Sequence, residues 1–423
     1  MSSKVNAVLA AIVAVSSVHG FATDIVGMPI DVWTDAVDNY VRDVVYNPED
    51  DEYLVLIENN RGGSEDIYAQ RVDSDGTLLS WFSVVAAAGE SHVEPSAAYN
   101  AARDEYLVVW CRGGGAGTDD DILARTVAWN GSSMGAVVEI DVGAGYQQDP
   151  DVAYNSADDE YLVVYDTFWM SGLEEVEAVR VRASDGSVVG SAIVAGDVSK
   201  TRQYAHVAYN TADNNYLIAY TVENAWVAVK LSPADLAGIA AATEQEIRSD
   251  ADSVSGDLGL AAGPSQFLVA WSENATGGLP GTIRARRVSL SGLPLGPADG
   301  FVVSPGLNSW SWRDSVGVGW GLFGSFVMAW DAHDAGGLDD LSGTVVRPGS
   351  DNAGTKTVAV CDVTPDQFYS ALDCAPSGAC LVAYTEYDSV GVDTDIKAKL
   401  FRPVPFADGF ESSDTSEWSS AVP

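Results

Sequence analysis

Basic residues are scarce in this sequence. Lys and Arg together number 22 among 423 residues, against 61 Asp and Glu, so the formal net charge at pH 7 is −39. Such a charge repels phosphate backbones and anionic lipid surfaces, which makes nucleic acid a poor partner. Cys and His are also scarce, with four of each, and neither paired CxxC motifs nor a His-rich cluster occurs. These absences argue against a structural zinc site.

Long hydrophobic runs are missing as well. The longest lies in the first 22 residues, MSSKVNAVLAAIVAVSSVHGFA, where one Lys precedes an apolar run that ends in small residues. This pattern predicts a secretory signal peptide over residues 1–22, because the run is shorter than the roughly 20 apolar residues of a membrane span. A membrane anchor is the alternative. We therefore expect a secreted protein, extracellular or at the cell surface, with the periplasm as the other option and no membrane span.

What the sequence has in abundance is a repeat. The stretch VVYNPEDDEYLVLI at 44–57 recurs at 97–110, 152–165 and 207–220, and degenerate copies follow at 260–271, 318–330 and 372–384. Successive copies are spaced by 53, 55, 55, 51, 59 and 54 residues. Each unit holds four strand-like runs separated by turns rich in Gly, Asp and Asn. A period of this length predicts an all-β, seven-bladed β-propeller of four-stranded blades.

The phase of the repeat predicts how the ring closes. A fourth-strand run precedes each group of three strands, and the first of these, MPIDVW at 28–33, lies at the start of the propeller domain, residues 23–403. The last group ends in DIKAKLFRP without a fourth strand of its own. We expect the N-terminal strand to complete the seventh blade, which leaves no free sheet edge.

The repeated acids mark a turn in this pattern. In AYNSADDEYLVV the acids change from copy to copy while the turn persists, as expected where Asn and Asp cap a reversal through their own side chains. The flanking tyrosines keep a separation of seven residues, which predicts cross-strand aromatic pairs. In the last copy this pair becomes Cys374 and Cys380, for which we predict a disulfide. Cys111 and Cys361 belong to blades that are not neighbours and are predicted to be buried thiols.

No cofactor is implied, and calcium is the one metal that the acids would suit. Acids lead into the third strand of several blades, and four of them, Asp119, Asp121, Asp393 and Asp395, are the calcium candidates. None matches the DxDxDG loop with its distal Glu. Blade architecture or loop solvation is the alternative role for this acidic series.

The loops that enter each first strand differ most between copies and are predicted to gather at one mouth of the channel. They carry aromatic, amide and charged residues of the kind that bind sugars, by ring stacking and hydrogen bonds. The candidate ligand-binding residues are Tyr40, Arg42, His92, Glu94, Gln148, Asp149, Tyr204, His206, Trp310, Trp312, Arg313 and Tyr369. The aromatic side chains could instead plug the channel.

A catalytic site is the alternative at the same mouth. A glycoside hydrolase needs two carboxylates across the scissile bond, and Glu94, Asp149 and Asp257 are the candidates. No nucleophile elbow, phosphate loop or metalloprotease helix motif occurs. The mouth arginines Arg42, Arg202 and Arg313 could receive a substrate carboxylate.

The run VAYN followed by EYLVVW, with DIYAQRV and DSDGTLL in the first blade, resembles the propeller-forming repeats of secreted bacterial surface proteins. The resemblance spans residues 29–403 and implies the propeller fold, with no catalytic residues. The Ser and acid-rich tail at 404–423 resembles a short C-terminal segment of secreted bacterial proteins, for sorting or processing, or is an unstructured end.

These observations favour a non-catalytic binding or interaction module for carbohydrate or another extracellular glycan or protein surface. A polysaccharide-acting hydrolase or lyase is the second hypothesis. A structural component of a surface layer or filament is the third.

Overall fold

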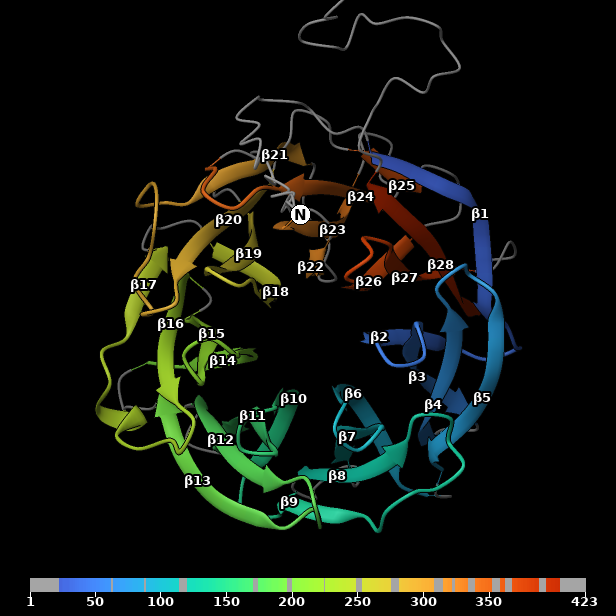
Figure 1. The fold of residues 1–423 in the computed structure, drawn as a ribbon, viewed down its shortest axis with the longest axis horizontal. Helices are drawn as coiled ribbons and strands as arrows, with labels where there is room; N and C mark the ends of the chain where they lie inside the picture. The colour runs from blue at the N-terminus through green and yellow to red at the C-terminus, as the bar shows by residue number, and fades with distance from the viewer. Residues whose placement is uncertain are drawn as a thin grey trace, which may run out of the picture.

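The computed structural model describes residues 23–61, 64–86, 89–113, 120–169, 174–195, 200–223, 225–248, 253–274, 281–307, 315–321, 324–333, 339–351, 358–361, 367–387 and 393–403. Seven four-stranded antiparallel sheets surround a central axis in this part of the chain (Figure 1). This arrangement confirms the predicted seven-bladed β-propeller. The signal peptide at 1–22 and the tail at 404–423 lie outside the described residues and stay predictions.

Each blade runs from an inner strand at the axis to an outer strand at the rim. Blades one and two are β2 (Asn39–Asn47), β3 (Glu52–Arg61), β4 (Ser64–Asp73), β5 (Leu78–Val85), then β6 (Ser91–Asn100), β7 (Glu105–Gly113), β8 (Asp121–Ala128), β9 (Val138–Asp141). Blades three and four are β10 (Tyr146–Asn155), β11 (Glu160–Phe168), β12 (Glu174–Arg182), β13 (Val188–Ala195), then β14 (Arg202–Asn210), β15 (Asn215–Val222), β16 (Trp226–Pro233), β17 (Gln245–Arg248).

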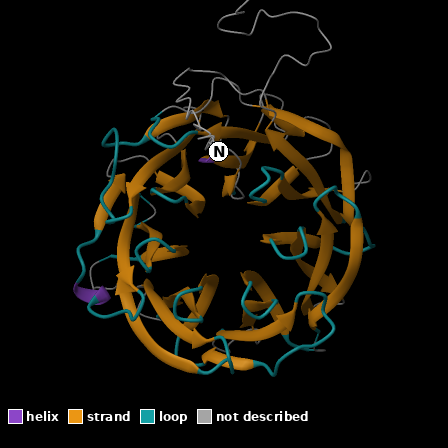
Figure 2. Ribbon diagram, in the orientation of Figure 1, coloured by secondary structure: helices purple, strands orange, loops and turns teal. Residues whose placement is uncertain are grey.

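The remaining three blades follow the same order. Blades five and six are β18 (Ser253–Ala262), β19 (Gln266–Asn274), β20 (Gly281–Ser289), β21 (Phe301–Leu307), then β22 (Val316–Gly321), β23 (Ser325–His333), β24 (Asp339–Val346), β25 (Val358–Cys361). Blade seven is β26 (Gln367–Cys374), β27 (Cys380–Tyr387), β28 (Thr394–Pro403) and β1 (Thr23–Trp33). The short 3-10 turn η1 (Ile239–Ala241), drawn in purple at the left of Figure 2, lies between β16 and β17.

The ring closes as the phase of the repeat predicts. Strand β1 pairs antiparallel with β28, and the register places Thr23 opposite Pro403 and Ile30 opposite Ala398. A surface ion pair of 2.5 Å between Lys397 Nζ and the Asp31 carboxylate joins the same two strands. The first strand of the domain therefore completes the last blade, and no sheet edge stays open between first and last blades.

The core is divided between the blades. Seven hydrophobic clusters occur among the described residues, and each joins two adjoining blades around the ring. The second strand of each blade supplies more buried hydrophobic side chains than any other strand of that blade, which explains its continuous apolar sequence. In six blades this strand carries an aromatic residue that is no more than 1% exposed: Trp110, Tyr165, Tyr220, Trp271, Trp330 and Tyr384. These residues pack the core, as predicted.

The aromatic pairs predicted from the repeat are present. Ring centroids lie 5.1 Å apart for Tyr46 with Tyr53 and 5.2 Å apart for Tyr154 with Tyr161, across directly opposed strand positions. The equivalent position in blade seven holds the predicted disulfide between Cys374 and Cys380. Cys111 is a buried free thiol, and the Cys361 side chain lies outside the described residues.

The acid-rich turns are structural. In blade three, Asn155 Oδ1 accepts the backbone N–H groups of Ala157 and Asp158 at 2.9 and 3.0 Å. Asp159 then adopts a left-handed φ of 55°, and its carboxylate accepts the hydroxyl of Tyr154 at 3.2 Å. Arg103 from the preceding blade donates to the same carboxylate. The acids of AYNSADDEYLVV therefore close a hairpin and join two blades.

Among the described residues, no helix is long and apolar enough to cross a bilayer.

Candidate ligand site at the channel mouth

Six of the seven inner strands, all but β22, carry a register shift against their second strand. The register between first and second strand shifts at Glu94, Asp149, Tyr204 and Tyr369, and all four residues have left-handed backbone angles, with φ between 49° and 57°. Such bulges redirect side chains and are frequent next to binding sites. A left-handed conformation costs a bulky residue roughly 1–2 kcal/mol, so these side chains are held there by their surroundings.

The bulges surround a hollow on the propeller axis. A cavity of about 190 Å³ is lined by residues of six of the seven inner-strand segments, which include Arg42, Glu94, Asp149, Tyr204, His206 and Tyr369. A second hollow of about 390 Å³ continues along the axis and is lined by residues of all seven inner strands. Six of the predicted ligand-binding residues thus come together from five blades.

Arg42 is the cation at the centre of this group. Its guanidinium lies over the ring of Tyr369 at 5.2 Å and that of Tyr40 at 5.7 Å, and the two rings meet edge to face. Arg42 Nε donates to Glu58 at 2.9 Å. Burial alone would lower the pKa of Arg42, but Glu58 and, more weakly, Glu94 raise it above its ordinary value, so the side chain stays charged.

The mouth carboxylates are connected by backbone contacts from blade to blade. The Glu94 N–H donates to Glu58 Oε2 at 3.1 Å, and Glu94 Oε2 accepts the Asp149 N–H at 3.0 Å. Burial raises the pKa of Glu94, with Glu58 and Asp120 adding to the effect against the opposing hydrogen bond and Arg42. Glu94 therefore both holds the next blade and presents a carboxyl group of raised pKa to the cavity.

Deeper in the channel, two further carboxylates accept backbone N–H groups of the next blade. Asp43 accepts the Ala97 N–H of the next blade at 2.9 Å, and Asp373 accepts the Tyr46 N–H at 2.8 Å. Burial is the main cause that raises the pKa of Asp43 to about 7 and that of Asp373 to about 6. Buried carboxyl groups therefore join the inner strands of adjoining blades.

The remaining candidates lie elsewhere. His92 is buried in blade two and accepts the Trp110 indole N–H at 3.1 Å, and the exposed Gln148 donates to Asp120 at 3.0 Å. Arg202 turns into blade four, where it pairs with Glu244 at 2.9 Å. None of these three lines the two axial hollows.

Several candidates cannot be placed. Trp310, Trp312 and Arg313 lie outside the described residues, and only the backbone of Asp257 is described, within β18.

Of the calcium candidates, Asp119 also lies outside the described residues, and Asp121 forms an ion pair with Arg112. Asp393 and Asp395 stand at and beside the start of β28. Within the described ranges, no three His, Cys, Asp or Glu side chains converge as a metal site. The structure thus gives the calcium hypothesis no assembled ligand set in this part of the chain.

The sequence reasoning missed a set of buried and half-buried cations that join the blades near the rim. Arg125, Lys230, Arg286 and Lys399 occupy the same register position of the third strand in four blades. Each donates to a carbonyl of the preceding blade's outer strand, at 2.6 to 2.8 Å: Val84, Val194, Ile247 and Val360. Aligning the third strands of the repeat would have shown this recurring basic position.

Known structures share the architecture. A protein of unknown function from Dyadobacter fermentans matches with a TM-score of 0.57 and 10% identity, covering 91% of this chain and 100% of that chain. A Trypanosoma rangeli sialidase in complex with sialic acid matches with a TM-score of 0.49 and 9% identity, covering 76% and 59% of the two chains. The propeller domain of the Trilobed protease from Pyrococcus furiosus gives 0.48 and 8%, covering 88% and 100%. At 10% identity the first match shows a shared fold alone, and the two matches with TM-scores below 0.5 are too distant to support any conclusion about this chain.

No protein-family model matches the sequence, and no curated protein does.

Proposed function

We propose that this protein is a secreted, non-catalytic binding propeller whose channel mouth holds a saccharide of an extracellular glycan or surface. The observation that carries the proposal is the convergence of Tyr204, Tyr369 and Arg42 with two carboxylates around one hollow of about 190 Å³. The blades supply these side chains from positions where the repeat does not fix the residue type.

The chemistry of the mouth suits a sugar. Tyrosine rings offer apolar faces for the C–H face of a pyranose, and carboxylate and imidazole groups can bond its hydroxyls. Because the Arg42 charge is already matched by Glu58, an uncharged ligand needs no further counter-charge at this position. A neutral or weakly charged saccharide is therefore favoured over a strongly acidic one.

A hydrolase or lyase is the second candidate, and one observation favours it. The pKa of Glu94 is raised by burial, which is what a general acid needs, and the carboxylate-bearing Asp149 lines the same hollow. Glu94 would protonate the leaving oxygen, and Asp149 would act as base or nucleophile. The Asp149 N–H bond to Glu94 fits a structural role for the same carboxylate equally well.

A glycan array and a hydrolysis assay on the same glycans separate the two candidates. Retention without released products supports binding, and released products that disappear in Glu94→Gln support catalysis. The double variant Tyr204→Ala with Tyr369→Ala should lose retention at least tenfold. Its control is Trp81→Ala, which removes an aromatic ring that is 57% exposed on the outer strand β5. Equal loss in both variants, or silence of the wild type in both assays, would reject the mouth as the site.

Secretion and membership among the secreted propeller-repeat proteins are part of this proposal. The disulfide between Cys374 and Cys380 is compatible with an oxidising location. Mass spectrometry of the protein recovered from its producing cells should find an N-terminus near Thr23 and the linked cysteine pair. An intact Met1 with both thiols free would reject secretion.

A further inference from the structure

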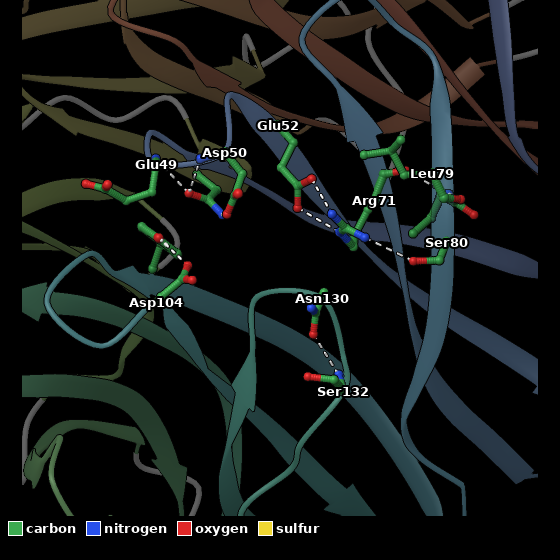
Figure 3. A network of polar contacts seen from close by, with 12 residues as sticks. Glu49, Asp50, Glu52, Arg71, Leu79, Ser80, Asp104, Asn130 and Ser132 are labelled. Atoms are coloured by element: carbon green, nitrogen blue, oxygen red, sulfur yellow. Dashed lines mark hydrogen bonds and ion pairs between the residues drawn. The ribbon is translucent and has the colours of Figure 1, made fainter.

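Two blades carry the same ion pair at the start of their second strand, and it is buried in blade one and half-buried in blade three. In blade one, Arg71 donates through Nε and Nη2 to the two oxygens of Glu52, at 2.7 and 2.6 Å (Figure 3). In blade three, Arg180 donates through Nε and Nη2 to Glu160 at 2.9 and 2.6 Å. The arginine stands at the same register position of the third strand in both blades. A glutamate at this place is therefore built to hold a guanidinium group.

The neighbouring blade covers the guanidinium in blade one. The ring of Trp129, which belongs to blade two, lies 4.4 Å from the Arg71 guanidinium carbon. Ser80 of the outer strand accepts a third hydrogen bond from Arg71 at 3.0 Å, also drawn in Figure 3. The complete site thus consists of a carboxylate, an outer-strand contact and a cover from the next blade.

Blade two keeps the glutamate and lacks the arginine. Glu105 corresponds to Glu52, but the register position of Arg71 is occupied by Thr126. The cover is missing too. Trp129 directly follows the residue opposite Glu105, and the equivalent position in blade three is Ala183, which follows the residue opposite Glu160. Beside Glu105, Thr126 thus stands at the position of Arg71, and Ala183 stands at the position of Trp129.

A pocket lies where the larger side chains are missing. It measures about 450 Å³, lies between blades two and three, and is lined by Glu105, Thr126, Gly135 and Ala183 among others. Glu105 Oε1 is buried and has no hydrogen-bond partner among the described residues. An unpaired buried carboxylate oxygen costs free energy, which a donor entering the pocket would recover.

Two arginines also line this pocket, and both are engaged elsewhere. Arg103 donates from Nε and Nη2 to the Asp159 carboxylate of blade three. Arg125 directs its N–H groups at the carbonyl oxygens of Gly135 and Val84. The charge of Arg103 opposes the rise that burial causes in the pKa of Glu105, but among the described residues neither arginine donates a hydrogen bond to Glu105 Oε1. This oxygen is therefore open to a further donor.

We propose that the pocket between blades two and three binds a guanidinium group from outside the chain, with Glu105 as its carboxylate partner. The group would take the place that Arg71 and Arg180 occupy in their own blades. The site is separate from the channel mouth and does not depend on the function proposed there. A small guanidinium compound and an arginine side chain of a protein partner share this chemistry.

Calorimetric titration of the full-length protein tests the proposal and separates the two sources. The probes are methylguanidinium, arginine capped at both ends, and capped citrulline, a neutral analogue of similar shape. We expect saturable binding of capped arginine that is at least tenfold tighter than that of capped citrulline. Equal affinity of methylguanidinium would identify a small guanidinium compound as sufficient, and clearly tighter capped arginine would identify a partner's side chain.

Two variants locate the binding. Glu105→Gln should weaken capped arginine at least tenfold, and Thr126→Arg should abolish its binding and raise the melting temperature, because it restores the internal ion pair. Thr126→Val is the control for the second change and should keep binding. Retained binding in Glu105→Gln, or capped citrulline binding as well as capped arginine, would overturn the proposal.

Discussion

The two ends of the inner strands use the same backbone conformation for different purposes. At the hairpin end, the left-handed residues are Asp51, Asp104, Asp159 and Asn214. At the mouth, they are Glu94, Asp149, Tyr204 and Tyr369. Asp and Asn enter the left-handed region more easily than other residues with a side chain, whereas three of the four mouth residues, Glu94, Tyr204 and Tyr369, gain nothing there from the backbone.

The contacts explain the difference. At the hairpin end each left-handed side chain accepts the hydroxyl of a tyrosine five residues earlier, in all four blades. The mouth side chains are of three residue types and line the axial hollow. Repetition thus identifies the residues that hold the blades, and departure from repetition at a strained position identifies candidate ligand contacts.

The largest expected effect is at the hairpin end. Tyr161→Ala removes a fully buried ring that packs on Tyr154. The free energy of unfolding should fall by about 3 to 5 kcal/mol, as is usual when a large buried aromatic side chain is deleted. Chemical denaturation measures this change. A loss below about 1 kcal/mol would mean that the repeated tyrosines are not what holds this end together.

A smaller loss is expected from the turn itself. Asn155→Ala removes the acceptor for two backbone N–H groups and the donor to Asn214 of the next blade at 3.0 Å. We expect a destabilisation of about 1 to 3 kcal/mol. The matched change near the opposite end of the same strand β10 is Gln148→Ala, which removes an exposed amide and should alter stability by less than about 0.5 kcal/mol. Equal losses would remove the distinction between the two ends.

Between the two ends, the buried carboxyl groups predict a dependence on pH. The pKa of Asp43 is raised to about 7 and that of Asp373 to about 6, from an ordinary value of 3.8 in the unfolded chain. Between about pH 4 and 7 the folded state therefore binds more protons than the unfolded state, so the free energy of unfolding falls as pH rises through this window.

The melting temperature should accordingly be higher at pH 5 than at pH 8, and Asp43→Asn should flatten this dependence. Differential scanning calorimetry across the range measures both. A melting temperature that rises with pH, or an unchanged slope in the variant, would show that these carboxyl groups are ionised in the folded protein.

Much of the fold could be predicted from the sequence because the blade repeat occurs in seven copies. The spacing of the copies predicts the blades, and the unmatched run at 28–33 predicts that β1 completes the last blade. The substitution of a tyrosine pair by Cys374 and Cys380 predicts the disulfide. In each case the same structural position occurs in several copies of the repeat. An irregular residue in one copy therefore does not hide the pattern.

The candidate site was only partly accessible, because side-chain direction at a bulge depends on the blade beside it. His92 and Arg202 belong to the right segments but turn into their own blades toward Trp110 and Glu244. The pocket beside Glu105 was missed for a related reason. It arises from Thr126 and Ala183, two small residues in different blades that are unremarkable in the sequence and adjoin one pocket only in the fold.

The most direct test compares glycine substitutions at left-handed positions of the two ends, since glycine keeps the backbone conformation and removes the side chain. One double variant carries Tyr204→Gly and Tyr369→Gly at the mouth, and the other carries Asp159→Gly and Asn214→Gly at the hairpin end. Glycan retention on the array is the measurement. We predict that the mouth variant loses retention while the hairpin variant keeps it at the level of the wild type. Retention by the mouth variant equal to that of the wild type would contradict the assignment of the ligand site.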